Sequence, residues 1–157
     1  MKKMIKILII VLLATSFSKC DRFRASHYPI YLINNAEHSI GFYFALGGRY
    51  GTRYPDTLLP KTNQYIVREV KPGRTFFFYS GTRWEDIFSK KPEGIMSAFI
   101  FHTDTLNRYT WEEVRDGYMI LKRYDLSLDD LQRLNFHIYY PPTEAMRNIR
   151  QFPPFGQ

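Results

Sequence analysis

The sequence predicts a mostly β protein: a single β-sandwich-like domain of about seven strands with two or three short helices, after an N-terminal export signal. Three observations lead to this prediction. Short apolar runs, alternating or continuous, recur along the chain between clusters of turn residues. Aromatic residues make up 17% of the chain, and they favour strands over helices. The first apolar run directly follows lysines at the chain start, which is typical of a signal peptide.

Residues 1–19 have the layout of a signal peptide. Three lysines precede an apolar stretch over residues 7–17. About 11 residues rise only ~16 Å as a helix, against about 30 Å of bilayer hydrocarbon, so this stretch is too short for a permanent span. Without residues 1–19, 18 basic residues face 15 acidic ones, and the net charge falls from +7 to +3. This small excess argues against a nucleic-acid partner.

The remaining chain divides into three parts. Residues 20–28 are short and polar and are expected to form a tether. Residues 29–142 form the β-rich domain, which is large enough for one hydrophobic core. Residues 143–157 form a C-terminal tail that begins with a helix-like segment and continues as Phe-Pro-Pro-Phe. The tail either docks on the sheet or hangs free.

Two hairpins are expected in the first half of the domain. Residues 30–35 and 39–46 are strand-like runs separated by an Asn-Asn turn, and in the second run the apolar residues alternate. Residues 64–70 and 74–80 form a second pair, joined by the turn signal at residues 71–73.

Three further strands complete the count of seven. Residues 95–102 are apolar on both faces, as expected of a central strand that is covered from two sides. Residues 119–125 and 136–142 follow, and Pro141 and Pro142 end the last strand because proline cannot donate to the ladder.

Short helices are predicted where a hydroxyl residue is followed three positions later by an acid. This spacing allows a capping box, in which the two side chains satisfy backbone donors reciprocally. The pairs are Thr82 and Glu85, Thr110 and Glu113, and Ser127 and Asp130. Each acid has an acidic neighbour. These acids complement the helix dipole in a first turn, so we interpret them as structural rather than catalytic.

No catalytic, metal or cofactor motif is present. The four histidines have no His-Glu-x-x-His spacing, there is no cysteine pair, and Gly-x-Ser-x-Gly is absent. His102 and Asp104, two residues apart, come nearest to a base or ligand pair, and His137 could join them across strands. We therefore expect a protein that is not an enzyme, with no cofactor. The alternative is an envelope hydrolase acting on glycans or peptides.

The most distinctive segment is a loop of about 17 residues, 47–63, longer than most loops without a function. No Gly-Lys-Ser/Thr follows its glycines, so it is not a phosphate loop. Arg49, Tyr50, Arg53 and Tyr54 could present stacking faces and planar donors to a sugar, a peptide or an anionic glycan. Alternatively, both tyrosines fold back on the sheet and both arginines are solvated.

A resemblance adds to this interpretation. Residues 101–142 contain "TDTL", "WEE", "ILKRYDLS" and "YPP". In these motifs the chain resembles uncharacterised small cell-envelope lipoproteins of Bacteroidetes. The resemblance implies a location in the cell envelope, at the outer membrane or the periplasmic side. That family has no established activity, so it implies no catalytic residue.

The only cysteine, Cys20, is the candidate lipid attachment site. Lipoprotein signals place small residues before the cysteine; here Ser18 fits and Lys19 does not. A competing cut after Ser18 would leave a periplasmic or secreted chain without an anchor. Lipidation would consume an otherwise odd thiol, and residues 21–28 supply the spacer that an anchored domain needs.

We therefore expect an exported, lipid-anchored, non-catalytic binding or accessory module. Its expected partners are the membrane, through the lipid, and a glycan or a protein. A structural subunit of a surface assembly is the further alternative.

Overall fold

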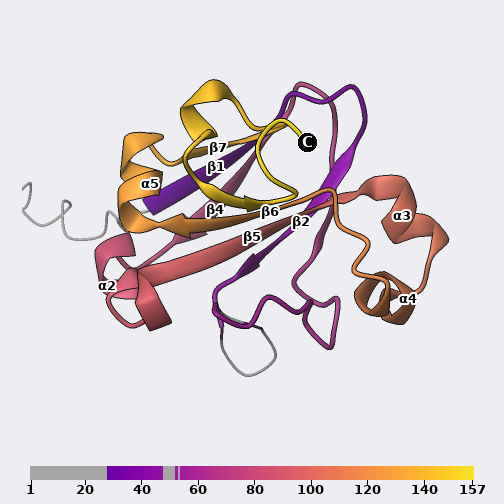
Figure 1. The fold of residues 1–157 in the computed structure, drawn as a ribbon, viewed down its shortest axis with the longest axis horizontal. Coiled ribbons are helices and arrows are strands. Elements are labelled where there is room, and N and C mark those ends of the chain that lie inside the picture. The colour runs from indigo at the N-terminus through magenta and orange to yellow at the C-terminus, as the bar shows by residue number, and fades with distance from the viewer. Residues whose placement is uncertain (1–27, 48–51, 53) are drawn as a thin grey trace, which may run out of the picture.

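The computed structural model describes residues 28–47, 52 and 54–157, and within these residues the protein is mostly β (Figure 1). Eight strands form two sheets, and four short α-helices lie among them. The strands are β1 (Tyr28–Asn34), β2 (Ile40–Ala45), β3 (Val67–Val70), β4 (Thr75–Ser80), β5 (Ile95–His102), β6 (Lys122–Ser127), β7 (His137–Tyr140) and β8 (Arg150–Phe152). The helices are α2 (Trp84–Phe88), α3 (Thr103–Arg108), α4 (Trp111–Asp116) and α5 (Leu128–Arg133).

The strands pair in two separate sheets. One has the order β4-β1-β7, in which β1 runs antiparallel to β4 and parallel to β7. The other has the order β3-β2-β5-β6-β8, and all its neighbours are antiparallel. The two-sheet fold confirms the predicted mostly β class. Among the helices of the described residues, none is long and apolar enough to cross a membrane.

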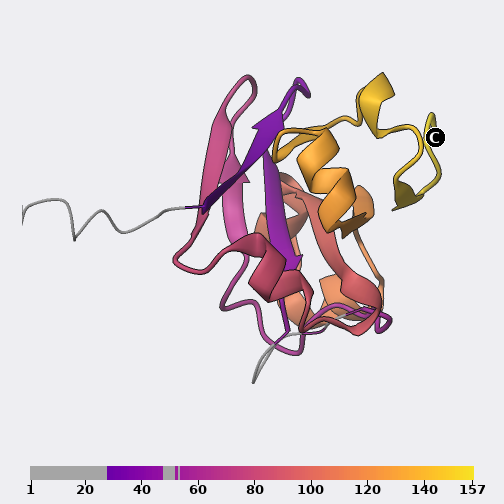
Figure 2. The ribbon, with the colours of Figure 1, turned by 90° about the vertical axis from the view of Figure 1, so that its left-hand side faces the viewer.

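Two hydrophobic cores lie on opposite faces of the five-stranded sheet. The larger one lies between the sheets and joins side chains such as Leu32 and Ile138 from one sheet to Phe42 and Tyr124 from the other. The smaller core covers the far face, where side chains of β2 and β5 pack against α3, α4 and Leu59 of the long loop. The layers are therefore the three-stranded sheet, the five-stranded sheet and the helical cover (Figure 2).

The predicted central strand is confirmed. β5 lies in the middle of the five-stranded sheet, between β2 and β6. Met96 and Ile100 point into the larger core, whereas Phe99 and Phe101 point into the smaller one. A strand that faces a core on each side has no polar face to show, which explains its continuous apolar run.

Both predicted hairpins are wrong, because in each case the turn carries the chain from one sheet to the other. β1 pairs with β4 and β7, whereas β2 and β3 pair within the second sheet. Asn34, fully buried, links the two crossovers: its side-chain amide donates to the carbonyl oxygens of His38 and Val70, each at 2.8 Å. Its backbone carbonyl accepts from Gly73, whose φ of 67° suits glycine.

The helix starts agree with the sequence in two cases out of three. α4 and α5 begin with full capping boxes at Thr110 and Ser127. α2 begins at Trp84 after Arg83 and has no side-chain cap, so the predicted box at Thr82 is wrong. Trp84 instead anchors this helix, because its ring is buried and its indole N–H donates to the carbonyl of Tyr28 at 3.2 Å.

The C-terminal segment contains a strand that the sequence did not reveal. A 3-10 helix at Glu144–Met146 replaces the expected helix-like segment, and β8 then pairs with β6. Of the two alternatives for the tail, the structure shows the docked one.

Candidate functional site

The candidate site is a pocket of about 330 Å³ beside β8. It lies where the start of β5, the strand β6 and the first turn of α5 meet the segment before β8. Its lining is mostly polar and consists of Glu93, Ile95, Asp125, Asp130, Asn148 and Arg150.

Asp125 is the most buried of the charged residues that line this pocket, and it is only 2% exposed. In the sheet it lies between Ser97 of β5 and Arg150 of β8. The Ser97 hydroxyl donates to Oδ1 of Asp125 at 2.7 Å, and Nε of Arg123 lies 3.2 Å from the same oxygen. The other oxygen, Oδ2, is buried, and no group in the described part of the chain donates to it.

A buried carboxylate oxygen without a donor is unusual in a folded protein. Most buried polar atoms have a partner, and leaving one unsatisfied costs about 1 to 3 kcal/mol. Arg123 offsets the charge of Asp125, but it does so at the opposite oxygen. Oδ2 therefore lacks the donor that a buried carboxylate oxygen normally has.

Arg123 and Arg150 are held in place by aromatic residues. Nη1 of Arg123 donates to the Tyr118 hydroxyl at 2.9 Å, and its guanidinium carbon lies 5.8 Å from the centre of the Phe152 ring. Nη1 of Arg150 donates to the Tyr54 hydroxyl, and its guanidinium carbon lies 5.7 Å from that ring's centre. Among the described residues no carboxylate pairs with Arg150, so its remaining N–H groups can serve a ligand.

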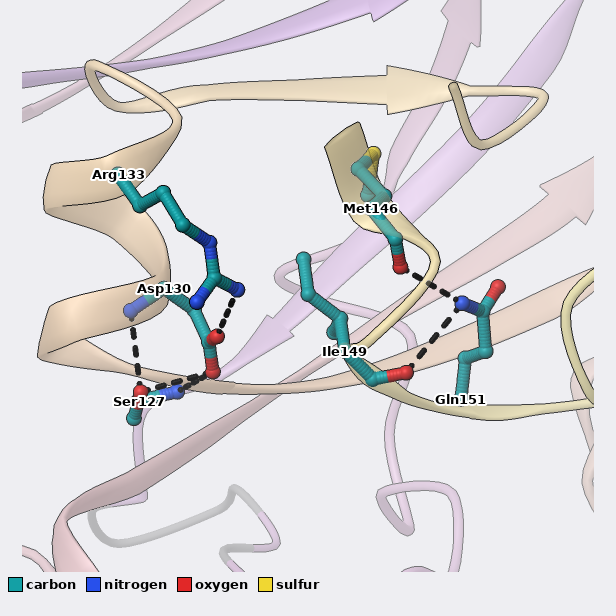
Figure 3. Close-up of polar contacts among 6 residues, drawn as sticks. All are labelled: Ser127, Asp130, Arg133, Met146, Ile149 and Gln151. Atoms are coloured by element: carbon teal, nitrogen blue, oxygen red, sulfur yellow. Dashed lines mark hydrogen bonds and ion pairs between the residues drawn. The ribbon is translucent and has the colours of Figure 1, made fainter. Parts of the chain in front are cut away.

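Asp130, another lining residue, is held in place by the capping box of α5 (Figure 3). Oδ2 of Asp130 accepts from the backbone N–H of Ser127 at 3.0 Å and from its hydroxyl at 2.7 Å. Oδ1 accepts from Arg133 at 2.6 Å. Both carboxylate oxygens of Asp130 thus already have partners. This residue lines the pocket, but we do not expect it to bind a ligand.

Gln151 holds the segment that carries Asn148. Its side-chain amide donates to the carbonyl oxygens of Met146 at 3.0 Å and Ile149 at 3.3 Å, so the chain loops around it (Figure 3). Asn148 lies within this loop and is exposed. Gln151 therefore holds this pocket segment in place, while the exposed side-chain amide of Asn148 can rotate toward a ligand.

The lining suits a neutral ligand rich in hydroxyl groups. Asp125 and Glu93 accept, Arg150 donates, and Asn148 can do both, whereas a hydroxyl group also donates and accepts. The two acids disfavour an anion. A metal ion has no ready set of ligands, because the described residues contain no group of three or more His, Cys, Asp or Glu side chains that could hold one.

Of the residues predicted to bind a ligand, only Tyr54 can be placed. It is 8% exposed, and its hydroxyl accepts from Arg150, so it supports a pocket residue. Arg49, Tyr50 and Arg53 lie outside the described residues, as does the candidate lipid site Cys20. For these four residues the sequence-based interpretation stays a prediction.

Of the three residues of the hydrolase alternative, His102 and Asp104 contact each other, whereas His137 has separate surroundings. His102 Nδ1 accepts from the backbone N–H of Asp104 at 3.1 Å and lies 3.8 Å from its carboxylate, and the ring stacks on His38 at 4.5 Å. His137 belongs to the other sheet, where its ring stacks on Tyr31 at 4.5 Å. His102 thus serves as the N-cap of α3.

Sequence reasoning missed Asp125 and Arg150. One signal was present: β6 contains Arg123 and Asp125 at alternate positions within a strand that is otherwise buried. A charged group in such a place needs partners. The hydroxyl donor of Asp125, Ser97, lies 28 residues before it, and its register neighbour Arg150 lies 25 residues after it.

Comparison of the chain with models of protein families, with curated proteins and with solved structures finds no match.

Proposed function

We propose that this chain is an exported, lipid-anchored cell-envelope protein whose domain is a non-catalytic binding module for a sugar unit or a similar polyhydroxylated group. The signal-like residues 1–19, Cys20 and the resemblance to envelope lipoproteins support export and anchoring. The observation that carries the binding role is the buried Oδ2 of Asp125, which has no donor among the described residues and belongs to a pocket-lining side chain.

A sugar hydroxyl supplies what Asp125 lacks. It can donate to Oδ2 while accepting from Arg150, and neighbouring hydroxyls on the same ring can reach Asn148 or Glu93. A volume of about 330 Å³ is at the small end of ligand pockets, which favours one or two sugar units over a long chain. Weak binding is expected, because few apolar side chains line the pocket.

The binding role is tested by titrating the exported protein with a panel of neutral monosaccharides and disaccharides, followed by ligand-detected NMR. At least one sugar should bind saturably. Asp125→Asn should weaken that binding about tenfold, since it removes a charge-assisted hydrogen bond. Asn148→Ala should weaken sugar binding by a smaller factor. Because Asn148 is exposed, this substitution should leave the fold intact, so it tests the pocket even if the Asp125 variant misfolds.

Asp129→Asn is the matched control, because Asp129 is exposed in the first turn of α5 and does not line the pocket. Its affinity should equal that of the parent protein. Saturable binding that survives both pocket substitutions, or no binding by any sugar, would refute the pocket as a sugar site.

The anchor is tested separately. Wild type and Cys20→Ser are compared by membrane fractionation and by mass spectrometry of the N-terminus. The wild-type protein should carry acyl chains on Cys20 and sediment with membranes, and the variant should not. Identical soluble behaviour of both proteins would remove the anchor from the proposal.

A further inference from the structure

The outer face of the three-stranded sheet carries an aromatic cluster. Ile30, Leu32 and Ile138 of this sheet point into the larger core, so the alternate residues point outward. These outward residues include Tyr31 from β1, Phe77 and Tyr79 from β4, and His137 and Tyr139 from β7. Tyr139 is half-buried and also packs against the larger core. We call these five residues the aromatic face.

The rings of the aromatic face contact one another across all three strands. Tyr31 lies between its register partners Phe77 and His137. Its ring centre is 5.4 Å from Phe77 in an edge-on arrangement and 4.5 Å from His137 in a stacked one. Phe77 and Tyr79 are 6.2 Å apart, and His137 and Tyr139 are 6.4 Å apart. The cluster is therefore one continuous surface.

This surface is open to solvent at its β4 side. Phe77 is 48% exposed and Tyr79 is 57% exposed. Four of the five side chains are the uncharged aromatics Phe and Tyr, and the fifth is the imidazole of His137. Figure 2 shows the three-stranded sheet on the outside of the molecule, with the five-stranded sheet on its other side. A contiguous exposed apolar patch of this kind marks an interaction surface.

The chain enters the sheet beside this patch. β1 begins at Tyr28, which is the register partner of Ser80, and Pro29 is the partner of Tyr79. Tyr28 follows Cys20 by eight residues, which extend to about 28 Å at most. A lipid on Cys20 would therefore hold the Tyr79 end of the aromatic face within that distance of the bilayer.

We propose that the aromatic face rests on the phospholipid surface to which Cys20 anchors the chain. This inference rests on the lipid anchor of the proposed function. Tyrosine and phenylalanine suit the membrane interface, because their rings are apolar while the tyrosine hydroxyl can remain in the headgroup region. The aromatic face then acts as a second membrane signal beside the acyl chains.

With the aromatic face on the membrane, the pocket would remain accessible from solution. The side chains of Ser97, Asp125 and Arg150 project from the same face of the five-stranded sheet as Phe99 and Phe101, away from the three-stranded sheet. With the aromatic face on the membrane, this side of the domain points away from the bilayer. The pocket would then be open to sugars from the surrounding solution.

The test uses an environment-sensitive fluorophore on a single new cysteine in the full, lipidated chain. Thr75→Cys places the fluorophore on the outward face of β4, and Glu112→Cys places it on α4, which covers the opposite side. Each protein is reconstituted in vesicles of phosphatidylethanolamine and phosphatidylglycerol. The Thr75 fluorophore should shift to shorter wavelength and be quenched by lipid-borne bromine, and the Glu112 fluorophore should remain in water.

A second measurement removes the rings. In the unlipidated Cys20→Ser chain, Phe77→Ser with Tyr79→Ser should weaken vesicle partitioning about tenfold. Leu58→Ser with Tyr65→Ser removes two exposed apolar side chains from the long connection between β2 and β3 and is the matched control. This control should partition like its parent.

The possible outcomes separate the two proposals. A Thr75 fluorophore that stays in water, in protein whose acylation is verified by mass spectrometry, would overturn this inference and leave the anchor intact. A wavelength shift without vesicles that grows with protein concentration would assign the face to a second copy and also overturn it. Sugar binding through the aromatic face, abolished by the double substitution, would count against the membrane in the same way. Absence of acylation would instead be a failure of the proposed anchor.

Discussion

The ammonium group of Lys122 donates a hydrogen bond of 3.0 Å to the carbonyl oxygen of Gln157. It also donates to the carbonyl oxygens of Pro153 at 2.9 Å and Pro154 at 3.3 Å. Lys122 is only 3% exposed, and burial lowers the pKa of its amine. Three backbone dipoles thus replace water around the charge and hold the tail beside β6.

Lys122→Met is expected to release the tail. The substitution keeps most of the apolar stem but leaves three carbonyl groups without their donor. Amides of residues 150–157 should exchange with solvent about tenfold faster in hydrogen-exchange mass spectrometry. Lys61→Met, at an exposed position, is the control and should change nothing. Unchanged exchange in the Lys122 variant would show that the tail docks by other contacts.

Gly41→Ala should destabilise the domain. A Cβ at this position would lie 2.4 Å from Cδ1 of Leu106 and 2.9 Å from the carbonyl oxygen of Val67. The backbone of β2 approaches β3 closely here, next to an irregularity in their register. We expect a loss of about 1 to 3 kcal/mol in the free energy of unfolding, measured by urea denaturation.

Gly81→Ala is the matched control for this substitution. A Cβ at Gly81 would meet no atom within 4 Å, and its φ lies outside the left-handed region. The unfolding free energy should stay the same or rise by a few tenths of a kcal/mol. Equal effects of both substitutions would refute the close approach at Gly41.

Strands β1 to β7 could be predicted from the sequence, but β8 and the pairing of the strands could not. Alternation in β2 and the continuous apolar run of β5 are local signals, and both were interpreted correctly. The turn after β1 crosses to the other sheet instead of closing a hairpin, and Asn34 beside this turn makes contacts that include Val70, 36 residues away. Nothing in a local pattern distinguishes these two outcomes.

The pocket residues could not be predicted from the sequence for the same reason. Asp125 and Arg150 are neighbours only because β8 pairs with β6, and β8 has just three residues followed by a proline. So short a strand gives no periodicity to recognise. One residue of the loop prediction, Tyr54, contacts Arg150 of this pocket.

The capping motifs at Ser127 and Thr82 look alike in the sequence but should contribute differently to the free energy of unfolding. Ser127→Ala removes a hydroxyl that donates to Asp130 and accepts from its backbone N–H, so about 1 kcal/mol of stability should be lost. Thr82→Ala should be nearly neutral, because Thr82 does not cap α2. Thermal unfolding of the two variants measures the difference. A loss at Thr82 as large as at Ser127 would contradict the cap assignment.

The alkaline limit of stability should depend on Tyr124. Burial raises the pKa of its hydroxyl well above the usual value, and this hydroxyl donates to the carbonyl oxygen of Tyr139 at 2.9 Å. In the unfolded chain the same tyrosine ionises at about pH 10. Above that pH the folded state binds more protons than the unfolded state. Tyr124 therefore makes the free energy of unfolding fall by up to about 1.4 kcal/mol per pH unit.

Tyr124→Phe should accordingly have opposite effects in two pH ranges. At neutral pH the variant should be less stable by about 1 kcal/mol, because the hydrogen bond to Tyr139 is lost. From about pH 10 upward its stability should fall less steeply than that of the parent protein, since one ionisation is gone. Urea denaturation across this range measures both effects, with Tyr65→Phe, at an exposed tyrosine, as the control. Parallel pH profiles for the parent protein and Tyr124→Phe would show that Tyr124 does not set the alkaline slope.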